Sequence, residues 1–385
     1  GFTKEEDTLD GWFDSGSTHY ASMKKDQGFW PATMYLEGLD QYRGWFQSSL
    51  LTAVGALGQG APFQECVTHG WTVDGEGKAM HKSLGNGVDP ADIFNENGAD
   101  ILRLWAASAD YHADVRCSKE IFKQLSQNYL KFRNTCKFML DNLVDFDPEN
   151  LVKPEEMPKL DRWLITKLNE LIEKAEQSYC DYEFHIITHA VNDFCVNTLS
   201  SFYLDIVKDR LYCDGADSLS RRSAQTALYL TLHTLSKLFA PILVFTCDEI
   251  WLAMPHTAAD DARNVVLNEM NKPFAAYALT ESEMADWEKL VDVRTAVNGV
   301  LEAARAEKKI GKSLEADVHL TVPAEDAFLA NMDGKELADL LIVSQVEVTV
   351  GEGVKASAEE AAGTKCPRCW KHSTAANAEG LCPRC

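Results

Sequence analysis

Long stretches with a helical repeat of apolar residues fill the middle of this 385-residue chain, from about residue 119 to residue 310. In DRWLITKLNELIEKAEQSY (161–179) the apolar residues recur every three or four positions, which places them on one face of a helix. FCVNTLSSFYLDIVKDRLY and SAQTALYLTLHTLSKLF show the same spacing, and Pro241 separates the second of them from the next apolar segment. Because such a stripe must be buried against neighbouring helices, this region is predicted to form an all-helical domain.

The two flanking regions show a different pattern. Before the helices, ECVTHGWTV (65–73) is typical of a strand, whereas 41–57 and 99–110 have helical spacing, which indicates part of a parallel α/β sheet. After them, helices alternate with the strand-like segments ADVHLTV and QVEVTV. The sequence therefore predicts five parts: an α/β domain at 1–118, a helical domain at 119–283, a small α/β subdomain at 284–350, a polar linker at 351–365 and a cysteine-rich end at 366–385.

The charge balance and the cysteines limit the class of protein. With 37 basic and 59 acidic residues, the net charge of -22 argues against a protein that coats nucleic acid, but it allows local basic patches. The chain has neither a signal peptide nor an apolar run of membrane-spanning length. It starts with Gly1 rather than Met, and we interpret it as a fragment whose amino-terminal part is missing. Seven scattered cysteines are expected to be buried, reduced thiols of a cytoplasmic protein: Cys66, Cys117, Cys136, Cys180, Cys195, Cys213 and Cys247.

The last twenty residues contain two CPRC motifs, Cys366–Cys369 and Cys382–Cys385, separated by twelve residues. Two CxxC pairs at this separation can place four thiolates around one structural zinc ion. So short a segment has almost no apolar core, so metal binding would supply its folding energy. The alternatives to a zinc site are a disulfide pair or a redox-active CxxC. Within a zinc site, His372 could substitute for one cysteine, but the four cysteines already complete the set of ligands. The chain stops at its fourth cysteine, which again is interpreted as the end of a partial sequence.

The segment DGEGKAMHKSLGN (74–86) follows the strand-like residues directly. Its glycines indicate an exposed, mobile loop, and Lys82 is a candidate partner for an anion such as a phosphate. Taken alone, a solvated turn is the simpler interpretation. The rest of the chain decides between the two.

Several motifs together resemble one family of enzymes. GKAMHKSLGN resembles the KMSKS loop of class I aminoacyl-tRNA synthetases. DGWFDSGSTH (10–19), YLEGLDQYRGWFQSSL (35–50), THGWTVDGEGK, GADILRLWAASADY and the terminal CPRCW…CPRC occur in the order expected of the bacterial isoleucine-specific members. The resemblance covers essentially the whole chain. It implies that residues 1–118 are the carboxy-terminal half of a Rossmann-type catalytic domain, and that the helical domain binds the tRNA anticodon.

The resemblance also assigns residues to the active site. It implies that Lys82 is catalytic, stabilising the charge that develops on the departing pyrophosphate, and that Ser83 binds ATP beside it. Residues Glu37, Gly38, Asp40 and Gln41 are expected to hold the isoleucyl-adenylate, with Trp45 and Trp12 forming an apolar wall around the isoleucine side chain. The sequence departs from the family motif at two places, because Ala79 replaces its first lysine and His81 replaces its serine.

The implied activity is the ATP-dependent attachment of isoleucine to tRNA(Ile) through an adenylate, by a class I ligase that is cytoplasmic and monomeric. Mg2+ would accompany ATP. This chain contains neither the HIGH motif nor the editing domain of that family, and Thr68-His69-Gly70 does not replace the motif. The chain alone is therefore expected to be inactive. Two alternatives remain: a non-catalytic, zinc-containing tRNA-binding module, and a relative of valyl-tRNA synthetase. Candidate contacts to tRNA phosphates are Lys208, Arg210, Arg221, Arg222, Arg305, Lys308, Lys309 and Lys312.

Overall fold

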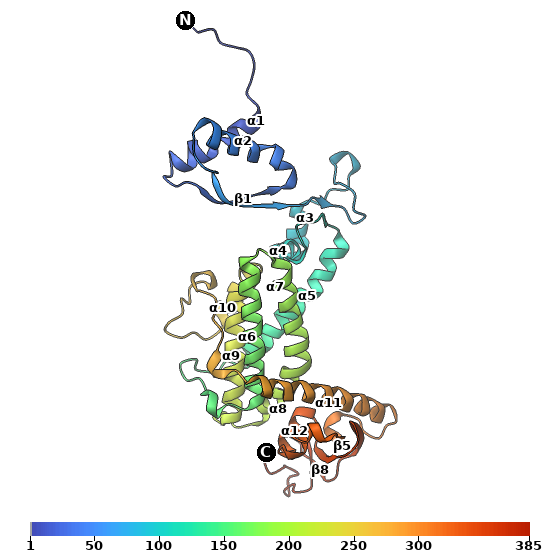
Figure 1. Ribbon diagram of the computed structural model, residues 1–385. Coiled ribbons are helices and arrows are strands. Elements are labelled where there is room, and N and C mark those ends of the chain that lie inside the picture. The colour runs from blue at the N-terminus through green and yellow to red at the C-terminus, as the bar shows by residue number, and fades with distance from the viewer. Residues whose placement is uncertain (1) are drawn as a thin grey trace. The chain divides into compact units, whose positions relative to one another are not determined.

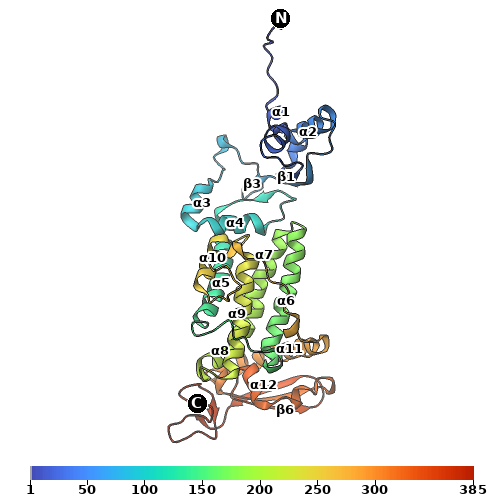
Figure 2. The same ribbon diagram turned by 90° about the vertical axis from the view of Figure 1, so that its left-hand side faces the viewer.

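The computed structural model describes residues 2–385, apart from the side chain of Lys82. It divides into two compact units, Gly1–Leu125 and Ser126–Cys385 (Figures 1 and 2). The predicted boundary at 118/119 coincides with the start of α5 (Lys119–Asp141), a helix that continues into the second unit. Each unit is described separately below.

The first unit is α/β and contains two small parallel sheets. In one, β1 (Ala32–Gly38) pairs with β2 (Phe63–His69), and the register places Glu37 opposite Thr68. In the other, β3 (Thr72–Val73) pairs with β4 (Val115–Arg116). The helices of this unit are α1 (Gly11–Gly16), α2 (Trp45–Leu51), α3 (Pro90–Asn97) and α4 (Ala99–Ser108). π-helical turns lie at His19–Lys24 and Thr52–Ala56, and 3-10 turns at Leu39–Arg43 and Lys82–Leu84.

Two predictions for this unit need correction. The segment 41–57 is not one helix, because Gly44 separates a 3-10 turn from α2. The segment 65–73 is not one strand, because the chain passes from β2 to β3 at Gly70. There the Gly70 N–H donates to the carbonyl of Tyr111 at 2.8 Å, and a Cβ at this position would lie 2.4 Å from the Ala113 oxygen. Only glycine permits so close an approach of two backbones.

The second unit is dominated by the predicted helices, of which α6, α7, α9 and α10 run side by side (Figure 1). Their apolar faces form the core, with Leu164, Leu168, Leu228 and Trp251 fully buried. The break at Pro241 is confirmed, since one helix ends at Phe239 and the next begins at Val244. The helices are α6 (Lys159–Cys180), α7 (Phe184–Asp193), α8 (Leu204–Cys213), α9 (Leu219–Phe239) and α10 (Val244–Ala253), with a π-helical segment Phe194–Tyr203 between α7 and α8.

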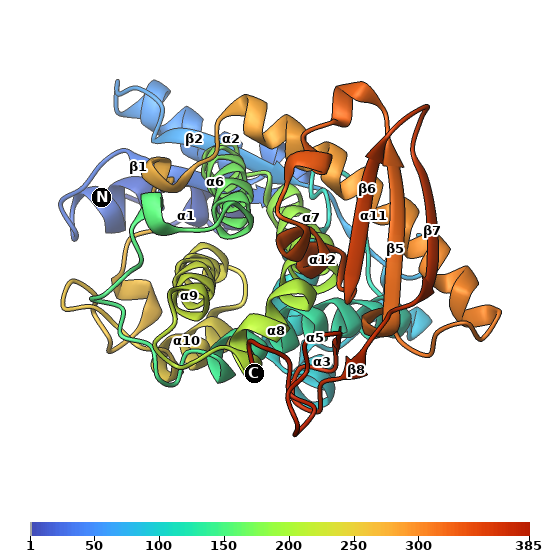
Figure 3. The same cartoon turned by 90° about the horizontal axis from the view of Figure 1, so that it is seen from below.

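A three-stranded sheet with two helices follows the bundle. Helix α11 (Glu281–Ala306) crosses the end of the bundle (Figure 1). Trp287 on this helix stacks on Trp163 of α6. The predicted strands are β5 (Ala316–Val322) and β6 (Gln345–Val350), which pair in parallel, and α12 (Gly334–Leu341) lies beside β6 (Figure 3). The apolar side chains Val318, Leu320 and Val322 of β5 are buried on one face of the sheet.

The predicted linker at 351–365 is wrong in its central part. Residues 355–360 form β7 (Lys355–Glu360), which pairs with β5 in the antiparallel direction and completes the sheet order β6-β5-β7 (Figure 3). An edge strand is stabilised largely by its backbone hydrogen bonds, and only the small side chains Ala356 and Ala358 are partly buried. The low apolar content that indicated a linker is therefore compatible with a strand. Short strands β8 (Thr364–Lys365) and β9 (His372–Ser373) begin the cysteine-rich end.

Among the described helices, none combines the length and the apolar character that crossing a membrane requires. The expectation that all seven scattered cysteines are buried is wrong in part. Cys117, Cys136, Cys195 and Cys247 are buried, whereas Cys66 and Cys180 are exposed and Cys213 is half-buried. Burial raises the pKa of the Cys195 thiol to about 12, which keeps it protonated and unreactive.

Candidate functional site

Glu37 lies at the carboxyl end of β1, where β2 also ends at His69. The indole Nε1 of Trp45, on the first turn of α2, donates to Glu37 Oε1 at 3.2 Å. The same tryptophan packs on Tyr35, with 4.7 Å between ring centroids, and the Tyr35 hydroxyl lies 2.8 Å from Ser49 Oγ. The carboxylate is thus oriented by Trp45, which packs on Tyr35, and Tyr35 is in turn held by Ser49.

The residues after Glu37 form a short polar turn. Gln41 Nε2 donates to Asp40 Oδ2 at 3.1 Å, and Gln41 Oε1 accepts from the Trp45 backbone N–H at 3.4 Å. A Cβ at Gly38 would lie 2.8 Å from Asp40 Oδ1, so glycine lets this carboxylate approach the backbone. The structure therefore brings Glu37, Gly38, Asp40, Gln41 and Trp45 together.

Trp12 stands apart from this group in the contacts of the described residues. It lies on α1, 47% exposed, where its backbone N–H donates to Asp10 Oδ1 at 2.7 Å. Helix α1 packs against α2, the helix that carries Trp45. A buried group not predicted from the sequence is His19, whose Nε2 lies 3.2 Å from Thr52 Oγ1. Burial, and then the charge of Lys24, lower the pKa of His19, so the imidazole is neutral near pH 7.

The loop 74–86 is closed by two side chains, Asp74 and Asn86. Asp74 Oδ1 accepts the backbone N–H groups of Glu76 at 3.0 Å and Lys78 at 2.9 Å, and its Oδ2 accepts from Asn86 Nδ2 at 2.8 Å. Asn86 uses both ends of its amide, accepting from His81 N at 2.9 Å and donating to the Ala79 carbonyl at 3.1 Å. The hydrogen bond from Asn86, and then that from Lys78 N, lower the pKa of Asp74.

The predicted catalytic residue, Lys82, has its side chain outside the described part of the structure. Its backbone begins a single 3-10 turn, Lys82–Leu84. The predicted ATP-binding Ser83 is exposed, and its Oγ lies 2.6 Å from His81 Nδ1. The neighbouring cation Lys78 forms a 2.7 Å ion pair with Glu76.

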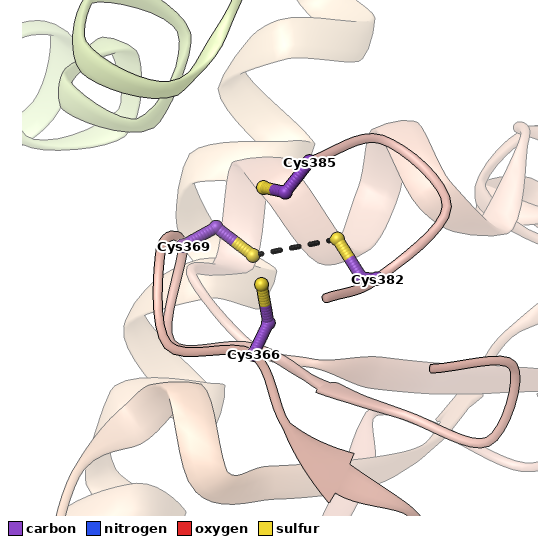
Figure 4. A group of neighbouring side chains, drawn as sticks. All are labelled: Cys366, Cys369, Cys382 and Cys385. Atoms are coloured by element: carbon purple, nitrogen blue, oxygen red, sulfur yellow. Dashed lines mark hydrogen bonds between the residues drawn. The ribbon is translucent and has the colours of Figure 1, made fainter. Parts of the chain in front are cut away.

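The four terminal cysteines converge on one point (Figure 4). Their Sγ atoms all lie within 4.8 Å of one another, and those of Cys369 and Cys382 are 3.6 Å apart. A tetrahedral zinc ion with Zn–S bonds of about 2.3 Å requires S···S distances of about 3.8 Å, so this donor set fits the ion. Burial alone raises the pKa of Cys366, but backbone N–H groups, those of Cys369 and Cys382 first, outweigh it and lower the pKa to about 6. His372 instead places Nδ1 3.1 Å from the Ala361 carbonyl.

The cysteine cluster is held against the helical unit by ion pairs. Arg384 Nη2 donates to Asp209 Oδ1 on α8 at 2.8 Å, and Arg384 also approaches Asp214 at 3.8 Å. On the other side, Lys371 pairs with Asp339 on α12. Burial raises the pKa of Asp209, but the hydrogen bond and charge of Arg384 outweigh it and hold the pKa below its usual value. These pairs are mostly buried, so they fix the cluster on the surface formed by α8 and α12.

The basic residues predicted to contact tRNA behave in different ways. The prediction of Arg210 as a phosphate contact is wrong, because its side chain is only 13% exposed and forms a bidentate pair with Asp161 at 2.6 and 2.9 Å. Arg221 makes a bidentate pair with Asp145 at 2.7 and 3.0 Å, which Arg222 also approaches. The others are more exposed: Lys208 pairs with Asp205, Arg305 with Glu302 and Lys309 with Glu307, whereas Lys312 lies over the Trp370 ring.

The Asp145–Arg221 pair predicts a pH dependence of stability. The hydrogen bond and charge of Arg221 lower the pKa of Asp145 to about 2. A carboxyl group whose pKa is lower in the folded state than in the unfolded state stabilises the protein at pH values above its ordinary pKa, near 4. This contribution is lost as the pH falls from about 4 through 2. Because the Asp145 side chain is 43% exposed, solvent screening limits the contribution to about 1 kcal/mol. We expect Asp145→Asn to unfold about 1 kcal/mol more easily at pH 7 in urea titrations, and we expect most of this difference to be lost at pH 2.

Asp141→Asn is the matched control, since Asp141 ends α5 just before the turn that carries Asp145 and pairs with Lys137 at 2.8 Å on the surface. This exposed i,i+4 pair contributes only about 0.3–0.5 kcal/mol. An Asp145→Asn penalty that is the same at both pH values would show that the ion pair is not its cause.

Comparison with known proteins matches two parts of the chain to family models. Residues 1–118 match the family model "tRNA synthetases class I (I, L, M and V)", and residues 161–320 match "Anticodon-binding domain of tRNA ligase". Among solved structures, a complex of Agrobacterium radiobacter LeuRS with tRNA and LeuAMS has a TM-score of 0.56 at 17% identity, over 83% of this chain and 36% of that one. Methionyl-tRNA synthetase of Mycobacterium tuberculosis gives 0.54 at 18% identity, over 66% of this chain and 52% of that one. The fold is thus that of class I tRNA synthetases.

Sequence relatives make the assignment narrower. Isoleucine–tRNA ligase of Moorella thermoacetica is 45% identical over all of this chain and 43% of its own length, and that of Caldicellulosiruptor saccharolyticus is 46% identical over all of this chain and 42% of its own length. The chain is thus similar over its whole length to isoleucine–tRNA ligases, and it spans about two fifths of the length of these curated relatives.

Proposed function

We propose that the complete protein joins isoleucine to ATP and transfers the activated amino acid to tRNA(Ile). The observation that carries this proposal is the polar group at the carboxyl end of β1, in a unit that matches class I synthetases. The chain as a whole is 44–46% identical to isoleucine–tRNA ligases. Ligands of open parallel sheets bind at this end of the strands. The Glu37 carboxylate, oriented by Trp45, is an acceptor for the α-ammonium of isoleucine or the ribose hydroxyls of ATP. Trp45 offers an apolar surface for the amino acid side chain.

In the proposed mechanism, the loop 74–86 acts on the phosphates. As the carboxylate of isoleucine attacks the α-phosphate, negative charge accumulates on the departing pyrophosphate. A cation that meets this charge only as it develops lowers the barrier without tightening substrate binding. We assign this role to Lys82, with Ser83 beside it as the predicted ATP-binding neighbour and Mg2+ bound to the phosphates.

Lys82→Ala tests the assignment in the complete gene product. We expect the rate of isoleucine-dependent ATP–pyrophosphate exchange to fall about tenfold to hundredfold, because one charge contact to the transition state is lost. The KM for isoleucine should stay within about twofold, since the amino acid is held at Glu37 and Trp45. Lys119→Ala, at an exposed lysine of the same unit, serves as a control. An unchanged exchange rate would remove Lys82 from the mechanism, and valine-dependent exchange exceeding that with isoleucine would point to the valine enzyme.

We further propose that the four terminal cysteines hold one structural zinc ion, and that the second unit binds tRNA. The geometry of the thiols supports the zinc, which would cross-link two loops that have little core of their own. The match to an anticodon-binding domain supports the tRNA, for which Lys308 and Lys312, after α11, are candidate phosphate contacts. Within the described part of the chain, these two lysines form no ion pair with a carboxylate. We expect the protein to act in the cytoplasm as a monomer.

A further inference from the structure

The loop 74–86 has lost one cation relative to the motif it resembles, because Ala79 stands where that motif has its first lysine. The neighbouring Lys78 is a poor substitute, since its charge is compensated by Glu76 at 2.7 Å and its backbone N–H is bound to Asp74. Ala79 itself lies in a β-bridge with Val73, which keeps its backbone against the strand. The structure therefore raises the question of which side chain complements Lys82.

The ring of His81 is held in one orientation by Ser83. The Ser83 backbone N–H donates to His81 Nδ1 at 3.2 Å, and Ser83 Oγ lies 2.6 Å from the same nitrogen. A backbone N–H can only donate, so Nδ1 is the unprotonated acceptor, and the neutral ring carries its proton on Nε2. Serine at 83 thus selects the tautomer of the histidine two residues earlier.

The backbone of His81 is fixed as well. Its N–H donates to Asn86 Oδ1 at 2.9 Å, while the same amide binds the Ala79 carbonyl and Asp74. The residue is exposed, and none of the described ion pairs involves its imidazole. Nε2–H is consequently a donor with fixed orientation and free access to a ligand, one residue before Lys82.

We propose that His81 is a phosphate-binding residue, whose Nε2–H donates to a non-bridging oxygen of the ATP triphosphate and of the pyrophosphate product. The inference rests on the proposed function, because it names a further contact of the same site. It explains two departures from the motif together: the donor lost at Ala79 is replaced by a donor at His81, and Ser83 and Asn86 act as positioning residues that aim it.

Three substitutions at His81 separate donation from shape, in isoleucine-dependent ATP–pyrophosphate exchange by the complete gene product. His81→Ala removes the donor, and we expect the KM for ATP and for pyrophosphate to rise about tenfold, as for one hydrogen bond to a charged group. His81→Gln places an amide N–H near the Nε2 position and should stay within about threefold of wild type. His81→Asn ends at the Nδ1 position and should resemble alanine. The KM for isoleucine should not change in any of them.

His112→Ala is the control, because His112 is another exposed histidine of the same unit and pairs with Asp110. The proposal is overturned if His81→Ala leaves both phosphate KM values within twofold, or if it raises the KM for isoleucine equally. It is also overturned if glutamine restores no more than asparagine does.

A binding measurement on the chain itself separates this proposal from the proposed function. Nitrogen-15 spectra of the labelled imidazoles should show the Nε2–H tautomer at His81, and pyrophosphate with Mg2+ should shift its Nε2 resonance but not that of His112. If the complete protein shows no isoleucine-dependent exchange, the proposed function is wrong, and this titration alone decides on His81. If saturating pyrophosphate leaves the His81 resonance unchanged, His81 does not bind phosphate and the proposal is rejected.

Discussion

Cys366→Ser is expected to release one zinc ion per chain and to unfold the cysteine-rich end, roughly residues 362–385, while the helical bundle stays folded. Cys366 is fully buried and is one of the four converging thiols, and serine is a poor zinc ligand. Structural zinc in sites of this kind contributes about 10–16 kcal/mol of apparent binding free energy, far more than so short a segment gains from packing. Limited proteolysis should therefore cut the variant after residue 361, and metal analysis should find no zinc.

Cys213→Ser is a closely matched control for this prediction. Its thiol lies 3.8 Å from the Arg368 carbonyl, beside the cluster but outside it, so zinc content and protease resistance should be those of the wild-type chain. Stoichiometric zinc in Cys366→Ser, or zinc loss in Cys213→Ser, would contradict the four-thiolate site. Chelation of the wild-type protein should reproduce the proteolysis pattern of Cys366→Ser.

The cysteine cluster packs on helices α8 and α12, so release of the metal should also change the stability of these helices. The ion pairs Arg384–Asp209 and Lys371–Asp339 depend on the position of the two CPRC loops, which the metal would fix. Once those loops unfold, Asp209 on α8 loses its partner Arg384, and Asp339 on α12 loses its partner Lys371. Hydrogen exchange at the carboxyl-terminal turn of α8 is therefore expected to increase when zinc is removed, whereas α6 and α9 remain protected.

The sequence predicts those elements whose pattern has a local cause. The strand-like segments ADVHLTV and QVEVTV are strands in the structure with the same bounds, 316–322 and 345–350. The break at Pro241 also has a local cause, because proline lacks the backbone N–H that would continue the hydrogen-bonding pattern of a helix. In contrast, the strand at 355–360 owes its existence to the free edge of β5, which no residue in that segment reveals.

The candidate site could be predicted only in part, for a similar reason. Glu37, Asp40 and Gln41 lie close in sequence, and the structure joins them with Trp45 through short-range hydrogen bonds. The loop 74–86 was expected to be mobile because of its glycines. Its closure by Asp74 and Asn86, twelve residues apart, depends on hydrogen bonds that the glycine content does not indicate. The role of Trp12 stays a prediction.

Arg210 shows where reasoning from charge fails most clearly. In the sequence, SFYLDIVKDRLY places a basic residue at what looks like the polar face of a helix, and a phosphate contact was predicted. In the structure the guanidinium is only 13% exposed and meets Asp161, which is fully buried on α6. Burial alone lowers the pKa of Arg210, but the charge and hydrogen bonds of Asp161 outweigh it, so the net pKa is raised. The partner lies 49 residues away and could not be found from local patterns.

Asp161→Asn is expected to cost about 3–5 kcal/mol of unfolding free energy, measured by urea titration of the helical unit at pH 7. The carboxylate accepts four hydrogen bonds, from Tyr203 at 2.7 Å, from Ser223 at 2.5 Å and two from Arg210, and so joins helices α6, α8 and α9. Asparagine keeps the shape but removes the charge, which leaves a buried guanidinium without a counter-ion.

The double variant Asp161→Leu with Arg210→Met distinguishes the charge from the packing. It removes both ions, so the cost of burying an unpaired charge disappears, and its stability should lie within about 1–2 kcal/mol of the wild-type chain. Arg210→Met alone should be as damaging as Asp161→Asn, since it leaves the carboxylate unpaired. If Asp161→Asn cost less than about 1 kcal/mol, water would have to reach the Arg210 site. Arg210 would then have the access to solvent that contact with a tRNA phosphate requires.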